Sequence, residues 1–265
     1  LIVGNGLTSA DIVASLDARG HRGEITSLSR HGLRSKGHAA GTWQPRGDFS
    51  TAPAPTVLKL LGQIRVELEA GRTAGETWHP VFDALRGQGG AIWAALSLAE
   101  RRRLVRHLRV FWDVHRFRVA PQVEAALDRR IADGTLEVLA GSLVAASRDA
   151  RSFVIDIRPR SRRTIRQERY DAVIVATGPA HAAVIRENPA IASLHAAGLV
   201  GLDAYGLGLA VDAEAVALDA GGSPVPGLYV AGPLARGSFG ELMGLLEVTR
   251  HAEFVADRIV ERLIG

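Results

Sequence analysis

The segment that most constrains the fold of this chain is its start, where an apolar run meets a glycine turn and a helical pattern. Leu1-Ile2-Val3 is followed at once by Gly4-Asn5-Gly6-Leu7-Thr8-Ser9. In such a strand–turn–helix unit, the first glycine permits the turn, the second lets a pyrophosphate approach, and the third position needs a small residue for packing. Ser9 fills the third position. The helix amides and dipole would then face the phosphates of a dinucleotide.

The residues after the turn supply the context that this motif requires. A helix is predicted from about residue 7 to 19, with Ile12, Val13 and Leu16 on its apolar side and Gly20 as its C-terminal stop. A second apolar run at residues 25–28 predicts the next strand of a βαβ unit. The dinucleotide site is therefore favoured over an ordinary glycine turn.

Two polar positions near the turn bear on the choice of cofactor and on the start of the helix. An acid after the second strand would bind the ribose 2′-OH of NAD, whereas an arginine suits the 2′-phosphate of NADP. The strand ends in Ser29-Arg30-His31, which favours NADP over NAD, and a surface charge is the alternative role for Arg30. Asp11 forms a T-x-x-D capping arrangement with Thr8 at the helix start.

The rest of the chain alternates between helical and strand-like patterns. Prolines in residues 41–56 indicate a loop, and helical spacing follows at residues 57–68 and 91–118. Residues 136–139 and 152–158 have strand patterns, the latter half-exposed as in a hairpin. Residues 171–179 and 227–233 are expected as buried strands. One long helix is expected at 238–263, and its glycine-rich start leaves a second helix N-terminus open to an anion.

A cluster of aromatic and titratable residues lies at positions 111–118. Trp112, His115 and Arg116 fall on one helical face and could line a substrate or cofactor cleft. The favoured alternative is an amphipathic helix end that packs its aromatic side chains, with the basic residues close to a helix C-terminus.

Composition excludes several classes of protein. The chain has no cysteine among its 265 residues, which excludes disulfides, thiolate metal sites and a redox-active cysteine pair. No apolar stretch reaches the length of a membrane span and no signal sequence is recognisable, so a cytoplasmic protein without a membrane partner is expected. The arginine runs at 101–103 and 158–169 lack interleaved aromatic residues, so nucleic-acid binding is not expected.

Three motifs in order along the chain resemble the two-dinucleotide-binding-domain flavoproteins. They are Gly4-Asn5-Gly6 with Asp11, then Ala176-Thr177-Gly178, then the strand at 227–233 before the last helix. The resemblance covers essentially the whole chain. The sequence at residues 112–116 and 232–237 looks most like that of a bacterial group of FAD/NAD(P)-binding proteins distantly related to flavin monooxygenases.

The resemblance implies an α/β, Rossmann-like FAD/NAD(P)-binding fold with a parallel sheet, a β-hairpin segment and a helical insertion. Residues 1–180 would form the NAD(P)-binding domain, with the insertion at about 45–130, and residues 181–265 the C-terminal part of a flavin domain. Such proteins carry an earlier FAD fingerprint that this sequence lacks, so we interpret the chain as a fragment without that N-terminal segment.

The resemblance also implies cofactor contacts in the later motifs. Thr177 and Gly178 would lie at the cofactor, as would Gly232 and Pro233. The family usually has Gly-Asp at the last pair, and its acid contacts the flavin, so Pro233 removes the acidic role. Glu241, expected one turn into the final helix, could compensate, with a solvated charge as the alternative.

These observations favour an enzyme, an FAD-dependent oxidoreductase that uses NAD(P)H. A monooxygenase and a simple electron-transfer reductase are both consistent with the sequence. The absence of cysteine argues against a disulfide reductase. The cofactors carry the difficult chemistry, and no catalytic side chain can be named. The sequence does not identify the small-molecule substrate. The alternative function is a non-catalytic module that binds or senses NADP(H).

Overall fold

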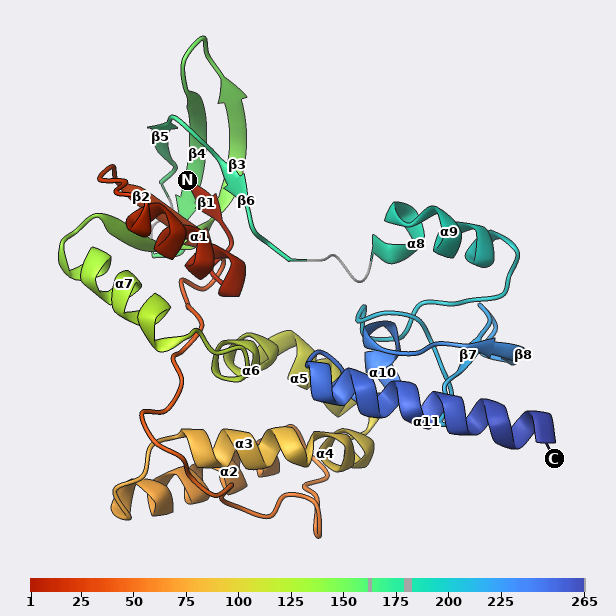
Figure 1. Cartoon of the computed structure of the whole chain (residues 1–265). Helices are drawn as coiled ribbons and strands as arrows, with labels where there is room; N and C mark the ends of the chain where they lie inside the picture. Colours follow the sequence, from red (N-terminus) through yellow and green to blue (C-terminus); the bar gives the residue numbers. More distant parts are fainter. Residues whose placement is uncertain (162–163, 179–182, 265) are drawn as a thin grey trace. The chain divides into compact units, whose positions relative to one another are not determined.

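The computed structural model describes residues 1–161, 164–178 and 183–264, in two compact units (Figure 1). The first unit combines Leu1–Thr42 with Arg109–Pro179, and the second combines Trp43–Leu108 with Ala180–Gly265. Each unit is therefore built from two segments that are distant in the sequence. The assignment of these residues to NAD(P)-binding and flavin domains stays a prediction.

The first unit contains a six-stranded sheet in the order β5-β4-β3-β2-β1-β6. Strand β1 pairs in parallel with β2 and β6, and β2 pairs in parallel with β3, while β4 is antiparallel to β3 and β5. The predicted α/β class, with a Rossmann-like parallel sheet and a hairpin, is confirmed. The strands are β1 (Ile2–Val3), β2 (Ile25–Ser29), β3 (Leu136–Arg148), β4 (Phe153–Pro159), β5 (Arg166–Tyr170) and β6 (Ile174–Val175).

The described residues of the first unit form the helices α1 (Leu7–Ala18), α6 (Arg109–Arg116) and α7 (Pro121–Ala132). Helices α1 and α7 pack against one face of the sheet through a buried cluster that includes Val13, Leu127 and Ile25. Gly20, at φ +79°, follows the end of α1 and donates its amide to the Asp17 carbonyl, as the predicted stop requires. The position of α1 on the sheet aims its N-terminus at the carboxyl end of β1.

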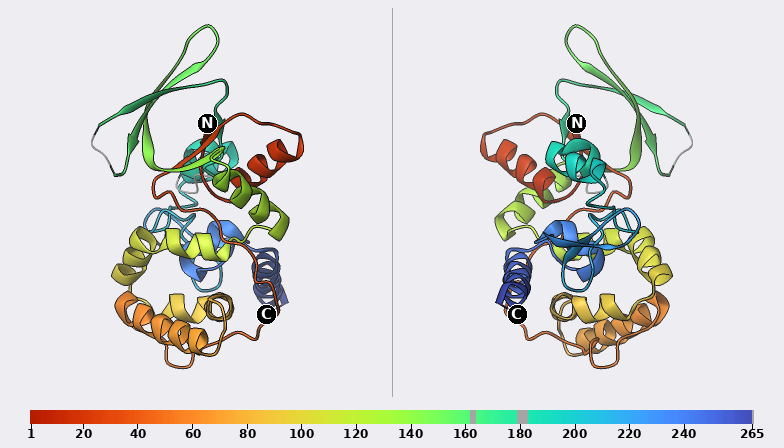
Figure 2. Two further views of the ribbon diagram at one scale, coloured as in Figure 1. Left: turned by 90° about the vertical axis from the view of Figure 1, so that its left-hand side faces the viewer. Right: turned by 90° about the vertical axis from the view of Figure 1, so that its right-hand side faces the viewer.

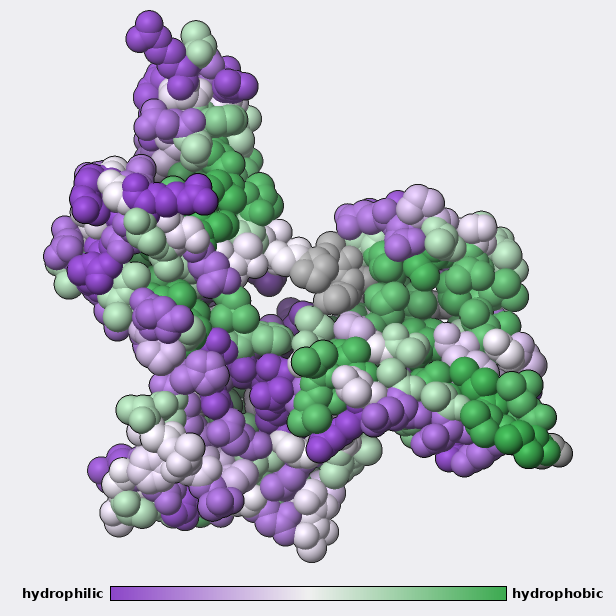
Figure 3. Space-filling view, viewed as in Figure 1, coloured by the Kyte–Doolittle hydropathy of each residue, from purple (hydrophilic) through white to green (hydrophobic). Residues whose placement is uncertain are grey.

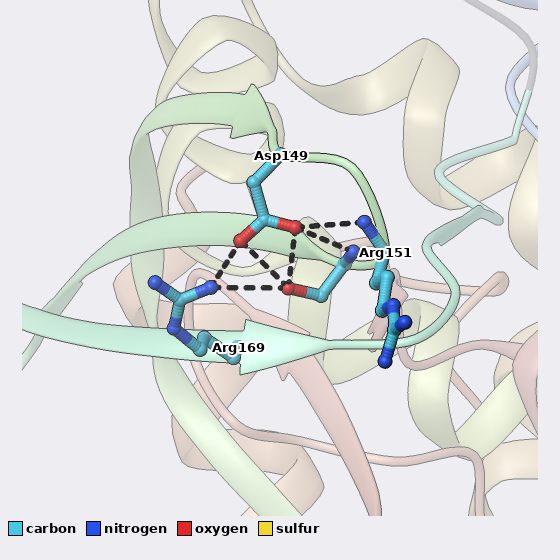
Figure 4. Close-up of polar contacts among 4 residues, drawn as sticks. Asp149, Arg151 and Arg169 are labelled. Atoms are coloured by element: carbon cyan, nitrogen blue, oxygen red, sulfur yellow. Dashed lines mark hydrogen bonds and ion pairs between the residues drawn. The ribbon is translucent and has the colours of Figure 1, made fainter.

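The β3–β4 hairpin extends beyond the parallel strands (Figure 2). At its turn, the Asp149 carboxylate accepts hydrogen bonds from the amides of Arg151 and Ser152 and contacts the guanidinium of Arg169 on β5 (Figure 4). The backbone donors, followed by Arg169, hold the pKa of Asp149 well below its usual range. Asp149 therefore fixes the turn and links it to the third strand of the hairpin sheet.

The second unit is mainly helical, with a two-stranded antiparallel sheet. Its core includes Val200, Leu209, Val211 and Ala217. The elements are α2 (Val57–Thr73), α3 (His79–Gly87), α4 (Gly89–Ala95), α5 (Leu98–His107), α8 (Val184–Glu187), α9 (Pro189–Ala196), β7 (Val216–Leu218), β8 (Pro224–Tyr229), the short 3₁₀ helix η2 (Pro233–Ala235), α10 (Arg236–Phe239) and α11 (Leu245–Ile264).

The two strands expected to be buried are not. Strand β6 lies at the sheet edge and its Val175 side chain is 72% exposed, because among the described residues only β1 pairs with it. Pro179, at the end of the expected run, lies outside the described residues. Strand β8 is largely exposed and, within the described ranges, pairs only with β7, consistent with Pro224 and Pro226, which cannot donate to a sheet ladder.

The single helix expected at residues 238–263 is also wrong, because the chain forms α10 and α11 with a break at Gly240. This glycine has φ +84°, and a Cβ there would lie 3.0 Å from the Cβ of Trp93. Glu241 therefore precedes α11 instead of lying one turn into it. The glycine-rich start at residues 236–240 forms a four-residue helix, too short to present the expected N-terminal anion site.

Helix α11 has a polar flank and several exposed apolar side chains, which appear as green surface near its ends (Figure 3). The most exposed are Leu245, Leu263 and Ile264, each at least 80% accessible. Within the described ranges, none of the helices combines the length and apolar character needed to cross a membrane.

Candidate functional site

The glycine turn between β1 and α1 lies at the carboxyl end of the parallel strands. Gly4 has φ +120°, and a Cβ there would lie 2.2 Å from the Ala176 carbonyl oxygen at the end of β6. The Ala176 amide donates to the Val3 carbonyl at 2.7 Å. The structure therefore brings Gly4 and the Ala176-Thr177-Gly178 segment together, and only glycine fits the first position of the turn.

Buried hydroxyl groups on α1 and β2 hold the turn in place through hydrogen bonds. Ser9 is 1% exposed, and its Oγ lies 3.1 Å from the Oγ of Ser27 on β2. The Ser27 hydroxyl can donate to the Gly4 carbonyl or to the Asn5 Oδ1, at 3.1 and 3.0 Å. Asn5 in turn donates its side-chain amide to the Leu33 carbonyl. Ser9 thus occupies the small, helix-packing position, and Asn5 ties the turn to the loop after β2.

The start of α1 is open. Gly6 is the N-cap, with nothing within 4 Å of the position of a Cβ, and Leu7 and Thr8 are exposed. Among the described residues no side chain caps this helix, so the capping arrangement expected of Thr8 and Asp11 is wrong: Thr8 lies inside the first turn, two positions after the N-cap residue Gly6. The first amides of α1 remain available to an anion.

Arg30, Thr177 and Gly178 lie in the same unit as the turn. Arg30 follows directly after β2 and is exposed. Thr177 and Gly178 follow β6 and are also exposed, and Gly178 has φ +74° with nothing within 4 Å of a Cβ position. These residues therefore share the carboxyl edge of the sheet, although their contact with a cofactor stays a prediction.

Gly232 and Pro233 lie in the second unit, between β8 and the short helix η2. Gly232 has φ +89°, and its amide donates to the His251 Nδ1 at 3.0 Å. His251 is 5% exposed, and burial lowers the pKa of its ring. Because Nδ1 accepts, the neutral ring carries its proton on Nε2. Sequence patterns gave no sign of this support, since His251 lies 19 residues from Gly232.

A cavity of about 550 Å³ lies beside His251, between α3–α4 and α10–α11. Its wall includes the bidentate pair in which Arg86 donates to the Glu247 carboxylate at 2.7 and 3.1 Å. Phe239 and Phe254 add apolar surface, with Phe239 ring-to-ring at 4.5 Å from His251. A separate concave region of the same unit is lined by residues that include Asp212, Tyr229 and Arg258.

The cluster on α6 has the features expected of a helix end. His115 and Arg116 occupy the last turn of α6. The His115 Nδ1 lies 2.7 Å from the Phe111 carbonyl, and the Arg116 guanidinium stacks over the Phe117 ring. These contacts favour the packing role, while a role in a cleft stays untested. No group of three potential metal ligands occurs among the described residues.

The comparisons with known proteins identify the fold. No family model matches the sequence, and no curated protein matches it. The chain has the fold of flavoprotein monooxygenases with Rossmann-like domains. Similar solved structures are L-lysine 6-monooxygenase from Pseudomonas syringae, with 16% identity and a TM-score of 0.57, and ornithine hydroxylase from Pseudomonas aeruginosa, with 16% identity and a TM-score of 0.55. The ornithine N-hydroxylase from Kutzneria sp. 744, described with reduced FAD, NADP⁺ and L-ornithine, has 17% identity and a TM-score of 0.52.

The matches cover 100%, 99% and 98% of this chain, but 53%, 52% and 53% of the respective neighbours. The chain thus spans about half the length of these proteins. At such identities the similarity establishes the fold, including the Rossmann-like arrangement expected from the motifs.

Proposed function

We propose that the chain is part of an FAD-dependent oxidoreductase of the monooxygenase kind, in which its first unit binds the NADP(H) dinucleotide. The observation that carries this proposal is the turn at Gly4, which is compressed against β6 on one side and open at Gly6 on the other. A pyrophosphate needs both features, a tight turn and an unobstructed helix N-terminus. The neighbour described as a monooxygenase and the N-hydroxylase described with reduced FAD and NADP⁺ support the same function.

Each residue of the turn has a distinct task in this proposal. The first amides of α1 would donate to the pyrophosphate oxygens, and Gly6 would allow the backbone to come close to them. Asn5, Ser9 and Ser27 would hold the turn in position through their hydrogen bonds. When bound, the nicotinamide supplies a hydride and FAD accepts it. The protein contributes orientation and charge.

The residues for FAD fit less completely. Gly232 has a backbone conformation that only glycine adopts readily, and its amide is already bonded to His251. Pro233 has no carboxylate to contact a flavin. This chain would therefore contribute a backbone turn to the flavin site, with the remaining contacts from polypeptide equivalent to the other half of the neighbours. For the 265 residues alone we expect weak or absent FAD binding.

The missing acid at Pro233 favours a second candidate, a module that binds or senses NADP(H) without turnover. The two functions share the dinucleotide site in the first unit. They differ in whether electrons leave the nicotinamide.

Two measurements test the proposal. First, calorimetric titration of the 265-residue chain with NADPH should show saturable binding. A titration without binding would refute the dinucleotide site. Second, protein expressed from the complete natural reading frame should be yellow, and NADPH should bleach its visible flavin band under anaerobic conditions. Flavin-free protein that binds NADPH without oxidising it would establish the sensing module instead.

A further inference from the structure

A group of three basic side chains lies at the same sheet edge as the glycine turn. Arg30 and His31 follow β2, and Arg160 follows β4. We propose that Arg160, together with Arg30 and His31, forms the subsite for the 2′-phosphate of NADP(H) and makes the chain prefer NADP(H) over NAD(H). This inference rests on the proposed function and adds to it a residue from a distant part of the sequence.

The backbone places these residues in one row across the sheet. The Gly4 amide donates to the Leu28 carbonyl at 2.8 Å, so the turn is level with the end of β2. Ser29 is the register partner of Ala140 on β3, and the Arg160 amide donates to the Ala140 carbonyl at 2.8 Å. Neighbouring strands lie about 4.8 Å apart, so Arg160 starts about 10 Å from Ser29, within reach of an arginine side chain.

A tight turn presents the other two basic residues. The Gly32 amide donates to the Ser29 Oγ at 3.1 Å and more weakly to its carbonyl at 3.4 Å. Arg30 and His31 are the two central residues of this turn, and both side chains are exposed. Gly32 has φ +62° and packs against Ala140, so only glycine closes the turn readily. The conformation therefore presents Arg30 and His31 at its tip, beside β3 and the residue after β4.

The side chains meet without a counter-ion. The Arg160 Nη1 contacts the His31 Nδ1 directly. Within the described ranges no carboxylate forms an ion pair with these three residues. Other arginines of this unit do have one, as Arg34 has with Asp128. Two adjacent basic groups without an acid constitute a site that an anion would stabilise.

A phosphate monoester is the anion that suits this place. In a dinucleotide bound over the turn, the adenosine ribose lies at the end of the second strand, where Arg30 and His31 are. A guanidinium can donate two parallel hydrogen bonds to phosphate, and a ring N–H of His31 can donate a third. NAD(H) has only a 2′-hydroxyl here, so it would gain nothing from Arg160.

The test compares dinucleotides that differ only at the 2′-position. Calorimetry would measure the affinities of NADPH, NADH, 2′,5′-ADP and 5′-AMP for the full 265-residue chain and for its Arg160→Gln and His31→Gln variants. We expect Arg160→Gln to lower the affinity for NADPH and 2′,5′-ADP about 10- to 100-fold, the loss typical of a charge-assisted hydrogen bond. The affinity for NADH should not change. Arg160→Lys should restore part of the affinity for NADPH.

Arg151→Gln is the matched control. Arg151 is exposed at the hairpin turn, about 20 Å along the hairpin from Arg160, and its loss changes the net charge equally. If Arg160→Gln lowered the affinities for NADPH and NADH alike, the inference would be wrong while the dinucleotide site remained. The same would hold if Arg151→Gln lowered the affinity for NADPH as much as Arg160→Gln does. If neither dinucleotide bound the parent chain, the proposed function would fail, and the subsite with it.

Discussion

The two glycines of the turn allow stability to be separated from cofactor binding. In Gly4→Ala, the new Cβ would lie 2.2 Å from the Ala176 oxygen, at φ +120°. Strain at such a backbone conformation costs about 1–3 kcal/mol, and the displacement of β6 costs about as much again. We expect the free energy of unfolding to fall by about 2–5 kcal/mol, which corresponds to a melting temperature roughly 5–15 °C lower.

Gly6→Ala should have the opposite profile. Gly6 has φ −95°, which any residue adopts, and its Cβ would meet nothing within 4 Å. The cost in stability should therefore be about 1 kcal/mol or less, the difference between glycine and alanine at an N-cap. The methyl group would occupy the space through which a pyrophosphate approaches, so NADPH affinity should fall about tenfold, the equivalent of one hydrogen bond to a charged group.

Urea unfolding followed by circular dichroism, together with calorimetric titration of NADPH, would measure both quantities for each variant. Gly4→Ala with the parent's stability would refute the close contact with β6. Gly6→Ala with unchanged NADPH affinity would refute the open approach to the helix N-terminus.

Three further predictions concern groups outside the turn. Because burial lowers the pKa of His251 below its ordinary value of 6.5, its contribution to stability is present above that value and is lost as the pH falls; His251→Gln should flatten the decline in urea stability between about pH 7 and pH 5. Burial, followed by the bond to Glu168, raises the pKa of Tyr170 to about 12, so its contribution is present below pH 10 and is lost as the pH rises through about 12; Tyr170→Phe should remove the latest phenolate absorbance step. Glu100, 8% exposed, accepts the Val57 amide at 2.7 Å, and Glu100→Ala should lower the free energy of unfolding by about 1–3 kcal/mol in thermal or urea unfolding.

Local patterns predicted much of the first unit. The βαβ unit at residues 1–29 and the stop at Gly20 depend on contacts within a few residues, and both occur as expected. In the second unit, the helical stretch after residue 57 was also expected, because apolar spacing alone indicates it. The helix cap predicted at Thr8 was wrong because a residue pattern can match a capping box two positions away from the true N-cap, here Gly6.

Other parts could not be predicted, because they depend on residues that the sequence keeps far apart. The break at Gly240 follows from Trp93, whose side chain lies against it. The support of Gly232 by His251 and the contact between His31 and Arg160 likewise have no local pattern. The two expected buried strands, β6 and β8, are exposed because hydrophobic runs alone do not reveal how many neighbours a strand has.

The sequence by itself determined that a short strand, a glycine turn and a helix would follow one another at the start of this chain, since steric limits on the backbone and apolar periodicity act locally. Only the tertiary structure decided that the turn would be closed on one side by Ala176 and left open at Gly6. It also decided which basic residues meet at the end of β2, because strand pairing, parallel between β2 and β3 and antiparallel between β3 and β4, places residues at one edge whatever their separation along the chain.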